Sequence, residues 1–415
     1  MKRLAILFLL AVNVTVGVWA QAVTDSAWHP AVRTVSLCRD GIEFEPPVLT
    51  LGTGERLVLR FDVLQAAPME LRYSIAHCNR DFEPDGMPEG EFMNGFAEGA
   101  IDNMQFSFTT NTDYVNYWQT VPADYSEFVA SGNYVITIYQ YDHPDSVLLT
   151  RRFYVSEAAA KVTLAVDRAT SAEGSLQNQE VSVGVEPMQN VSQQYLCVRL
   201  QQNGRVDNLR TLEFSGYDRN AYSYSRRSVN VFPGGNAFRY FDISNIRSPM
   251  HNVQQIERYG GETFAILRPL ENRSTRPLSS DRTLQGGMKV NVWDRDNKLT
   301  EADYVWVNFS LPAPTPLLGG SVHIVGDITD WAVDDRSRME WNPRYKAYNA
   351  RLFLKQGYYS YQVLYKPVGE REAQTALFEG DHYAATNAYT AYVYMRTPSD
   401  RYDRLLAVGR TFTSK

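Results

Sequence analysis

Short runs of β-branched and aromatic residues, with polar residues at alternate positions, recur along most of the chain. Three of the clearest are residues 56–61, 134–139 and 304–309, which have the length and composition of β-strands. Helical periodicity is scarce and is confined to residues 124–130 and 252–259, where single turns of helix are expected. The pattern therefore predicts an all-β protein built from tandem immunoglobulin-like or early-set β-sandwich domains.

Glycine, proline and small residues divide this pattern into modules. The first predicted sandwich covers residues 21–157, and the second covers 158–312. The second ends at the proline-rich stretch 312–316, which has the stiff, extended character of a linker and is the natural place for a hinge. An early-set-like sandwich is predicted over 313–400, and residues 401–415 are expected to form a tail.

The amino-terminal residues have the features of a secretory signal peptide. Lys2 and Arg3 precede an apolar run over 4–12, and small residues near Ala20 suit a signal peptidase. We therefore expect residues 1–20 to be removed after export. The apolar run is too short to span a bilayer, and no later stretch is long and uncharged enough to do so. The mature protein is thus expected in the periplasm, with no direct insertion into the membrane.

Charge and cysteine content narrow the class of protein. The formal charge is −6, and loss of two cations with the signal peptide makes it −8, which disfavours nucleic acid as a partner. The three cysteines, Cys38, Cys78 and Cys197, are an odd number, so at most one disulfide forms within the chain. Whether Cys38 joins Cys78 stays open at this stage.

Short motifs spread in order over most of the chain are more specific. In the first module they are Leu-Gly-Thr-Gly-Glu at 51–55, Tyr-Ser-Ile-Ala-His-Cys-Asn at 73–79, Ser-Gly-Asn-Tyr at 131–134 and Leu-Thr-Arg-Arg-Phe at 149–153. In the second they are Phe-Pro-Gly-Gly-Asn at 232–236, Phe-Arg-Tyr-Phe-Asp-Ile at 238–243 and Glu-Ala-Asp-Tyr at 301–304. In the third they are Gly-Asp-Ile-Thr-Asp-Trp at 326–331, Leu-Lys-Gln-Gly-Tyr-Tyr at 354–359 and Glu-Gly-Asp-His-Tyr at 379–383.

Together these motifs resemble the plug protein family of the type IX secretion system. Members of that family are periplasmic all-β proteins associated with a very large outer-membrane translocation barrel. The resemblance implies a protein, not an enzyme, that binds the barrel and occludes its periplasmic mouth when no substrate is passing. It implies no catalytic residues, no cofactor and no small-molecule substrate.

The last module also resembles the early-set β-sandwiches related to glycogen-binding modules. That resemblance rests on the motif at 326–331 and on the strand pattern that follows it. It implies an alternative function, carbohydrate binding, with Trp331 and Trp341 stacking on sugar rings. The structural interpretation is that both indoles are buried and fill the sandwich core, because burying an aromatic ring stabilises more than leaving it in water.

The connection over residues 79–100 is the best candidate for a partner-binding segment. It is long, and long connections are commonly functional. Its acidic residues are Asp81, Glu83, Asp85, Glu89, Glu91 and Glu98. Its apolar residues are Met87, Phe92, Met93 and Phe96, which we expect to serve as anchors for a protein partner. The alternative is that these side chains tuck under the connection and pin it to the sandwich.

Other candidate chemistry is weak. The six histidines are far apart in sequence, so no metal site is predicted. His77 and Cys78 are adjacent, but neighbours on a strand point to opposite faces, so they are not expected to act together. The segment 294–301 begins like a calcium loop but has Lys298 and Leu299 where a ligand and a glycine are needed. A hydrolase is the third and least supported interpretation.

Overall fold

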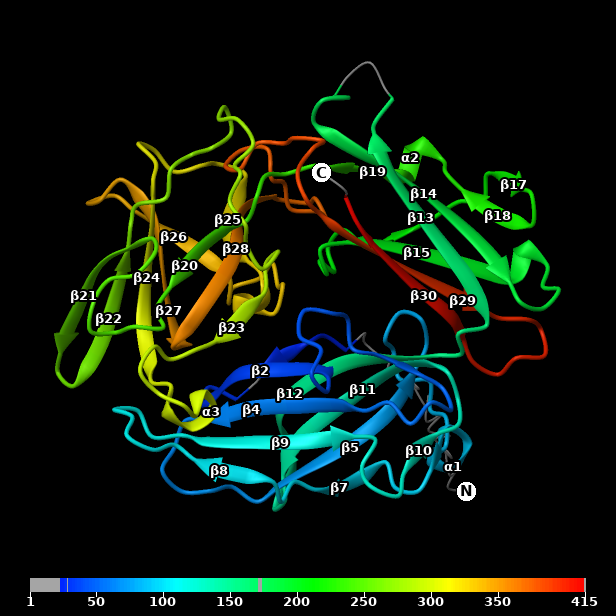
Figure 1. Ribbon diagram of the computed structural model, residues 1–415, viewed down its shortest axis with the longest axis horizontal. Helices are drawn as coiled ribbons and strands as arrows, with labels where there is room; N and C mark the ends of the chain where they lie inside the picture. The colour runs from blue at the N-terminus through cyan, green and yellow to red at the C-terminus, as the bar shows by residue number, and fades with distance from the viewer. Residues whose placement is uncertain (1–22, 28, 171–173, 414–415) are drawn as a thin grey trace, which may run out of the picture.

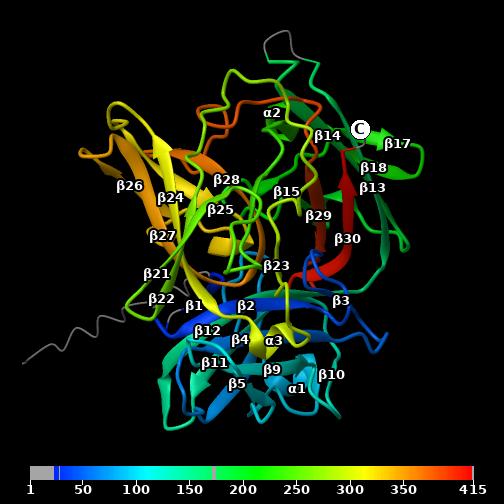
Figure 2. The same cartoon turned by 60° about the vertical axis from the view of Figure 1, so that its left-hand side comes forward.

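The computed structural model describes residues 23–27, 29–170 and 174–413. They fold into β-sheets with a few single turns of helix, which confirms the predicted all-β class. Figure 1 shows three domains packed around a common centre, the first below and the other two above it, and Figure 2 shows the same arrangement turned by 60°. The predicted signal peptide, residues 1–20, lies outside the described residues.

The first domain is a sandwich of two sheets. One sheet contains, in spatial order, β1 (Ser26–Ala27), β12 (His143–Ser156), β11 (Gly132–Gln140), β5 (Leu71–Cys78) and β7 (Glu98–Ala100), with β3 (Val48–Thr50) also paired to β12. The other contains β2 (Val32–Arg39), β4 (Leu57–Val63), β9 (Val115–Val121) and β8 (Met104–Phe106). One end holds the helical turn α1 (Glu89–Phe92) and a two-stranded pair, β6 (Met93–Asn94) with β10 (Glu127–Phe128).

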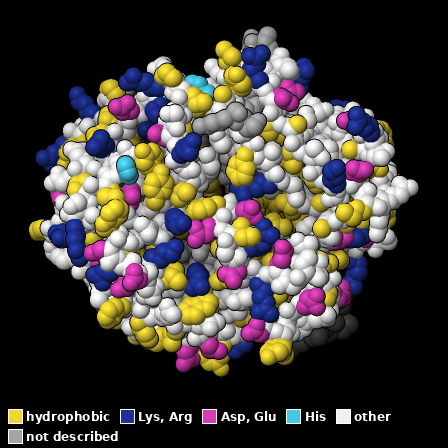
Figure 3. All heavy atoms as spheres, in the orientation of Figure 1, with side chains coloured by type: hydrophobic (Ala, Val, Ile, Leu, Met, Phe, Trp, Pro, Cys, Tyr) yellow, Lys and Arg dark blue, Asp and Glu magenta, His cyan; other side chains and the backbone are white. Residues whose placement is uncertain are grey.

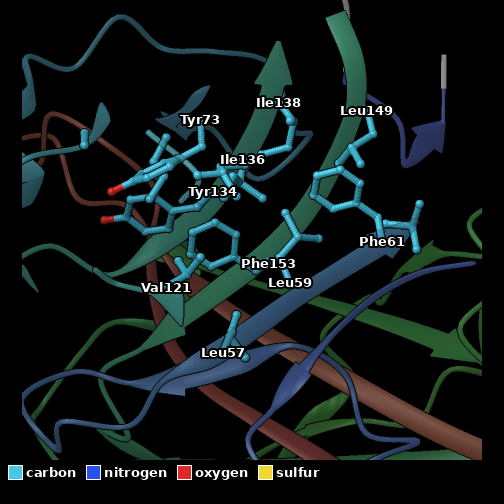
Figure 4. Packing of buried hydrophobic residues seen from close by; sticks show 14 of the residues in the cluster. Leu57, Leu59, Phe61, Tyr73, Val121, Tyr134, Ile136, Ile138, Leu149 and Phe153 are labelled. Carbon is cyan, nitrogen blue, oxygen red and sulfur yellow. The ribbon is translucent and has the colours of Figure 1, made fainter. Parts of the chain in front are cut away.

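Strict alternation of apolar residues builds the core between these sheets. Leu57, Leu59 and Phe61 lie at every second position of β4 and are fully buried. They face Tyr134 and Phe153 of the opposite sheet, as Figure 4 shows. The period-two pattern read from the sequence therefore sets which face of each strand is covered.

The second domain has two sheets as well. One contains β13 (Ala160–Arg168), β14 (Asn178–Pro187), β18 (Ala221–Tyr224) and β17 (Gly216–Asp218), with β19 (Val231–Pro233) paired to β14. The other contains β16 (Arg210–Thr211), β15 (Leu196–Gln202), β29 (Ala388–Met395) and β30 (Arg404–Phe412). The short helices η1 (Gln193–Tyr195) and α2 (Arg227–Asn230) lie in its connections.

Strands β29 and β30 correct the predicted domain boundaries. They come from the end of the described chain, yet β29 pairs with β15 over seven positions and completes the second core. The expected tail, 401–415, therefore contains a strand, and the segment expected to close the last module belongs to the second domain. Local patterns show where strands lie but carry no information on which distant strands pair, and this is why the sequence division failed.

The third domain is inserted between β19 and β29. Its nine strands are β20 (Arg239–Asp242), β28 (Gly357–Pro367), β25 (Gly320–Val325), β26 (Arg338–Asn342), β27 (Ala347–Lys355), β24 (Tyr304–Pro312), β22 (Glu262–Leu267) and β21 (Val253–Tyr259), with β23 (Met288–Val290) paired to β28. Strand β26 turns a corner, because Met339 pairs with β25 whereas Glu340 pairs with β27. The two halves of the sheet thus fold over one core. The turns α3 (Lys298–Glu301) and η2 (Asp327–Thr329) complete the domain.

Three local expectations were wrong, two of them in the third domain and one in the first. The stretch 312–316 is no hinge between domains, because Pro312 ends β24 opposite Ala347 and both flanks belong to one sheet. Residues 252–259 are a strand rather than a helical turn. A register shift between Val253 and Gln255 moves the next half-buried apolar residue, Ile256, to a helix-like spacing of three. The helical turn expected over 124–130 is also absent, since β10 occupies part of it.

Buried contacts hold the three domains together. Between the first and third, Lys355 Nζ lies 2.6 Å from Asp62 Oδ2, and both side chains are almost completely buried. Between the first and second, Tyr154 stacks on Tyr392 with ring centroids 4.5 Å apart. Between the second and third, Arg205 Nη2 donates to the carbonyl oxygen of Ala373 at 2.6 Å. The three domains therefore form one interlocked body.

Candidate functional site

The 79–100 connection divides its four predicted anchors between the core and the surface. Phe92 and Met93 are each only 2% exposed and pack in the first-domain core, with Phe92 edge-on to Tyr134. Met87 is partly buried against the same core. Phe96, by contrast, is 77% exposed. Met87, Phe92 and Met93 therefore pin the connection to the sandwich, as the alternative interpretation expects. Of the four predicted anchors, Phe96 is the one that is exposed to a partner.

The backbone of Phe96 is bonded to the turn that carries a second exposed aromatic residue. Its N–H donates to Ser126 Oγ at 3.1 Å, and the neighbouring Tyr125 is fully exposed. Gly95 makes this close approach possible: its φ is +101°, and a Cβ there would lie 2.9 Å from the carbonyl oxygen of Tyr125. Tyr125 itself has φ of +63°, an uncommon conformation for a residue with a side chain. We name Phe96, Tyr125 and the exposed Val129 the aromatic tip.

The aromatic tip lies at the end of the first domain that carries α1 and β10. Figure 1 places α1 and β10 at one end of the first domain and β7 along its lower edge, and Figure 3 shows hydrophobic and acidic side chains along the part of the lower margin that no grey atoms cover. Close to the tip in sequence, Glu91 pairs with Arg401 at 2.8 Å, and Glu98 and Glu127 are exposed. Apolar anchors with charged neighbours are the usual composition of a protein-binding surface.

His77 and Cys78 are adjacent on β5, and their side chains lie in different environments. The His77 ring lies edge-on to Tyr134, and its Nδ1 is 2.7 Å from Asp85 Oδ2. Cys78 packs instead with Phe82 and Val135, and burial raises the pKa of its thiol to about 12. All three cysteines are free thiols. A thiol with so high a pKa, pointing away from the neighbouring imidazole, is suited to packing rather than to nucleophilic attack.

The His77–Asp85 pair predicts acid sensitivity. Burial alone would raise the pKa of Asp85, but hydrogen bonds from His77 and from the Met87 N–H hold that pKa below its ordinary value of 3.8. A carboxyl with a lowered folded-state pKa stabilises the fold at higher pH, and this contribution is lost as pH falls through the folded pKa. We expect Asp85→Asn to lose less unfolding free energy than wild type between about pH 5 and about pH 3, as measured by urea titration. Asp102→Asn, an exposed site, is the control; equal losses in all three proteins would contradict the prediction.

The two tryptophans proposed for sugar binding are half-buried. Trp331 Nε1 donates to Asp327 Oδ1 at 2.6 Å, and its ring leaves so little room over Gly286 that a Cβ there would lie 2.2 Å from it. Trp341 packs against the third-domain core and donates to the carbonyl oxygen of Ala313 at 3.2 Å. Neither indole lies open on the surface as a sugar-stacking platform, and both stabilise the fold.

Comparisons with known proteins relate the first domain to a protein family. Residues 32–157 match the model of the type 9 secretion system plug protein 1st domain, a range that begins with β2 and ends just after β12. The first domain of this chain therefore belongs to the type 9 secretion system plug protein family. It is also similar, at 30% identity and a TM-score of 0.92, to a hypothetical protein from Parabacteroides merdae of known crystal structure. The likeness covers 95% of this chain and 100% of the other. No curated protein matches the sequence.

Plug proteins are a non-catalytic, secretion-associated family. A hollow of about 180 Å³ between the first and third domains is lined by Asp294, Glu301 and Asp303 among others. Asp294 pairs with Arg247 and Glu301 with Arg295, while Asp303 accepts backbone N–H groups from the first domain. Asp303 therefore joins the first domain to the third, while the other two carboxylates are paired with arginines within the third domain.

Two further features concern metals and membranes. Across residues 23–27, 29–170 and 174–413, no group of three or more histidine, cysteine, aspartate or glutamate side chains is placed to hold a metal ion. In the same described part of the chain, no helix is long and apolar enough to cross a bilayer. The plug family is associated with the periplasmic side of the outer membrane, and its members work beside a component of the secretion apparatus there.

Proposed function

We propose that this protein binds the periplasmic mouth of the type IX outer-membrane translocon and occludes it without catalysing a reaction. The observation that carries the proposal is the match of the whole first sandwich, residues 32–157, to the plug-domain model. The predicted signal peptide supports the periplasmic location that the function requires.

The architecture supports the same function. A protein that blocks a pore must resist deformation, and here the domains are joined by buried contacts rather than by flexible linkers. Arg404 of the second domain also pairs with Glu157 of the first at 2.6 Å. The aromatic tip then offers this rigid body an exposed anchor. Ordered aromatic anchors lose little conformational freedom on binding, which favours affinity.

The test is recovery of the translocon barrel with the tagged protein from detergent-solubilised outer membrane. Wild type should recover a very large barrel protein. Phe96→Ser should weaken recovery, because removing a central aromatic anchor costs about 2 kcal/mol, or roughly thirtyfold in affinity. Tyr259→Ser is the matched control, since Tyr259 is equally exposed at 83% but lies on the third domain.

The outcomes separate the proposal from its alternatives. Failure of wild type to recover a barrel would end the plug proposal, and retention of the protein on an α-glucan column would then favour carbohydrate binding. Recovery with wild type and Phe96→Ser alike would keep the plug function but remove the aromatic tip from the interface. Both variants should unfold at the temperature of wild type, because each site is on the surface.

A further inference from the structure

Strand β8 presents a short free backbone edge at Met104 and Phe106. The edge ends at Phe108, whose N–H donates to the carbonyl oxygen of Thr300 in the third domain at 2.8 Å. Strand β8 is the last strand of its sheet and pairs only with β9. The carbonyl oxygen of Asn103 accepts from the Trp118 N–H at 3.1 Å, and the Ser107 N–H donates to the carbonyl oxygen of Tyr114 at 2.8 Å. Hydrogen-bonded pairs alternate along an antiparallel ladder, so the backbone N–H and C=O groups of Met104 and Phe106 point away from β9.

The side chains of this edge do not protect it. Met104 is 39% exposed and Phe106 is 52% exposed, and Phe108, just beyond the strand, is 66% exposed. Natural edge strands are usually blunted by charge, proline or a bulge, or by being very short, as β8 is with its three residues. Other terminal strands of this protein follow that rule, since β13 carries Lys161 and Asp167 and β21 carries Glu257 and Arg258. The β8 sequence, Met-Gln-Phe, has no charged residue and no proline.

We propose that β8 accepts an extended segment of the translocon as an additional strand of the first-domain sheet. The inference rests on the proposed plug function and specifies how the contact is made. Main-chain groups of Met104 and Phe106 supply hydrogen bonds to the segment, and their exposed side chains pack against apolar residues at alternate positions in it.

The chemistry of the β8 edge also restricts which segment of the translocon can pair with it. Strands within a closed barrel have no free edge to offer, so the segment comes from a periplasmic loop or terminal extension of the barrel protein. Asp102 precedes β8 by two residues and is exposed, as is Glu98 on the adjacent edge strand β7. These acids favour a segment that carries a lysine or arginine beside its apolar residues.

Proline at position 106 separates the backbone contact from the side-chain contact. Phe106→Pro removes an N–H that points outward, so the ladder to β9 keeps its hydrogen bonds. Phe106→Ala removes the same aromatic ring but leaves the N–H in place. In the barrel-recovery experiment, we expect Phe106→Ala to weaken binding several-fold and Phe106→Pro to weaken it at least tenfold more. Thermal unfolding of both variants, compared with wild type, establishes that the domain remains folded.

Hydrogen exchange on the wild-type protein gives a second, independent measurement. The Met104 and Phe106 amides should exchange fast in the free protein and slowly in the purified complex with the barrel. The Ala100 amide, which the pairing of β7 with β5 also directs outward, is the control and should stay fast.

The results distinguish this inference from the function on which it rests. If wild type binds the barrel and Phe106→Pro binds as well as Phe106→Ala, strand addition is overturned while the plug function stands. Unchanged exchange at Met104 and Phe106 in the complex would overturn it as well. If wild type recovers no barrel, the plug function itself fails. A wild-type dimer in light scattering that Phe106→Pro dissociates would assign the edge to a second copy of the chain and overturn the translocon as occupant.

Discussion

Truncation after Asp400 is expected to unfold the second domain. The deletion removes β30, which pairs with β29 at eight positions and buries Leu405 and Leu406. Loss of these two leucine side chains alone forfeits about 3–6 kcal/mol, out of the roughly 5–15 kcal/mol that stabilises a typical domain. It also removes the carbonyl groups that accept the N–H groups of Glu157 and Ala159 at the first-domain junction.

Circular dichroism and guanidinium titration measure this effect directly. The truncated chain should lose cooperative unfolding of the second domain, whereas a chain ending at Thr413, the last described residue, should unfold as the full chain does. The sequence pattern predicted that residues 401–415 form a tail outside the domains. A truncated protein with an unchanged unfolding midpoint would restore that interpretation and contradict the strand pairing.

Lys355→Met is expected to destabilise the junction of the first and third domains. Lys355 Nζ contacts Asp62 Oδ2 at 2.6 Å and the carbonyl oxygen of Leu299 at 2.7 Å, and it lies 4.1 Å from the centre of the Tyr114 ring. Burial lowers the pKa of this lysine, although the charge of Asp62 opposes the shift. Removing one member of a buried pair leaves an uncompensated charge, at a cost of about 3–5 kcal/mol.

A second variant separates the effect of charge from that of shape. Asp62 also accepts hydrogen bonds from Tyr304 and Asn116, so Asp62→Asn with Lys355→Met removes both charges while keeping a polar group there. We expect the double variant to recover part of the unfolding free energy lost by Lys355→Met in denaturant titration. If the single variant costs less than about 1 kcal/mol, the pair is dispensable and the rigidity of the junction has another source.

Much of the fold follows from local patterns in the sequence. The runs at 56–61, 134–139 and 304–309 are strands β4, β11 and β24, because alternating β-branched and aromatic residues suit one buried face. The predicted domain boundaries were wrong because they depend on contacts between distant strands, which no short stretch of sequence contains. Strand β29 is buried at all eight positions, because it packs against the second-domain core on one face and against Tyr154 of the first domain on the other.

The candidate surface was predictable only in part. The sequence identified Phe96 but could not separate it from Phe92 and Met93, since burial depends on how the helical turn α1 docks on the sandwich. Tyr125 gave no signal, because its exposure comes from a turn that is fixed by contacts with Gly95. The edge strand β8 was missed as well: whether a strand ends a sheet depends on topology rather than on composition.

The insertion of the third domain also determines the order in which the three domains can fold during export. For an exported chain that crosses the inner membrane amino end first, the first and third domains can assemble from segments that have already emerged. The second cannot, because β15 must wait for β29 and β30, nearly two hundred residues behind it. A stalled or degraded chain therefore never acquires its complete shape. Under the proposed function, only molecules whose passage into the periplasm is finished therefore have the complete shape with which to close the pore.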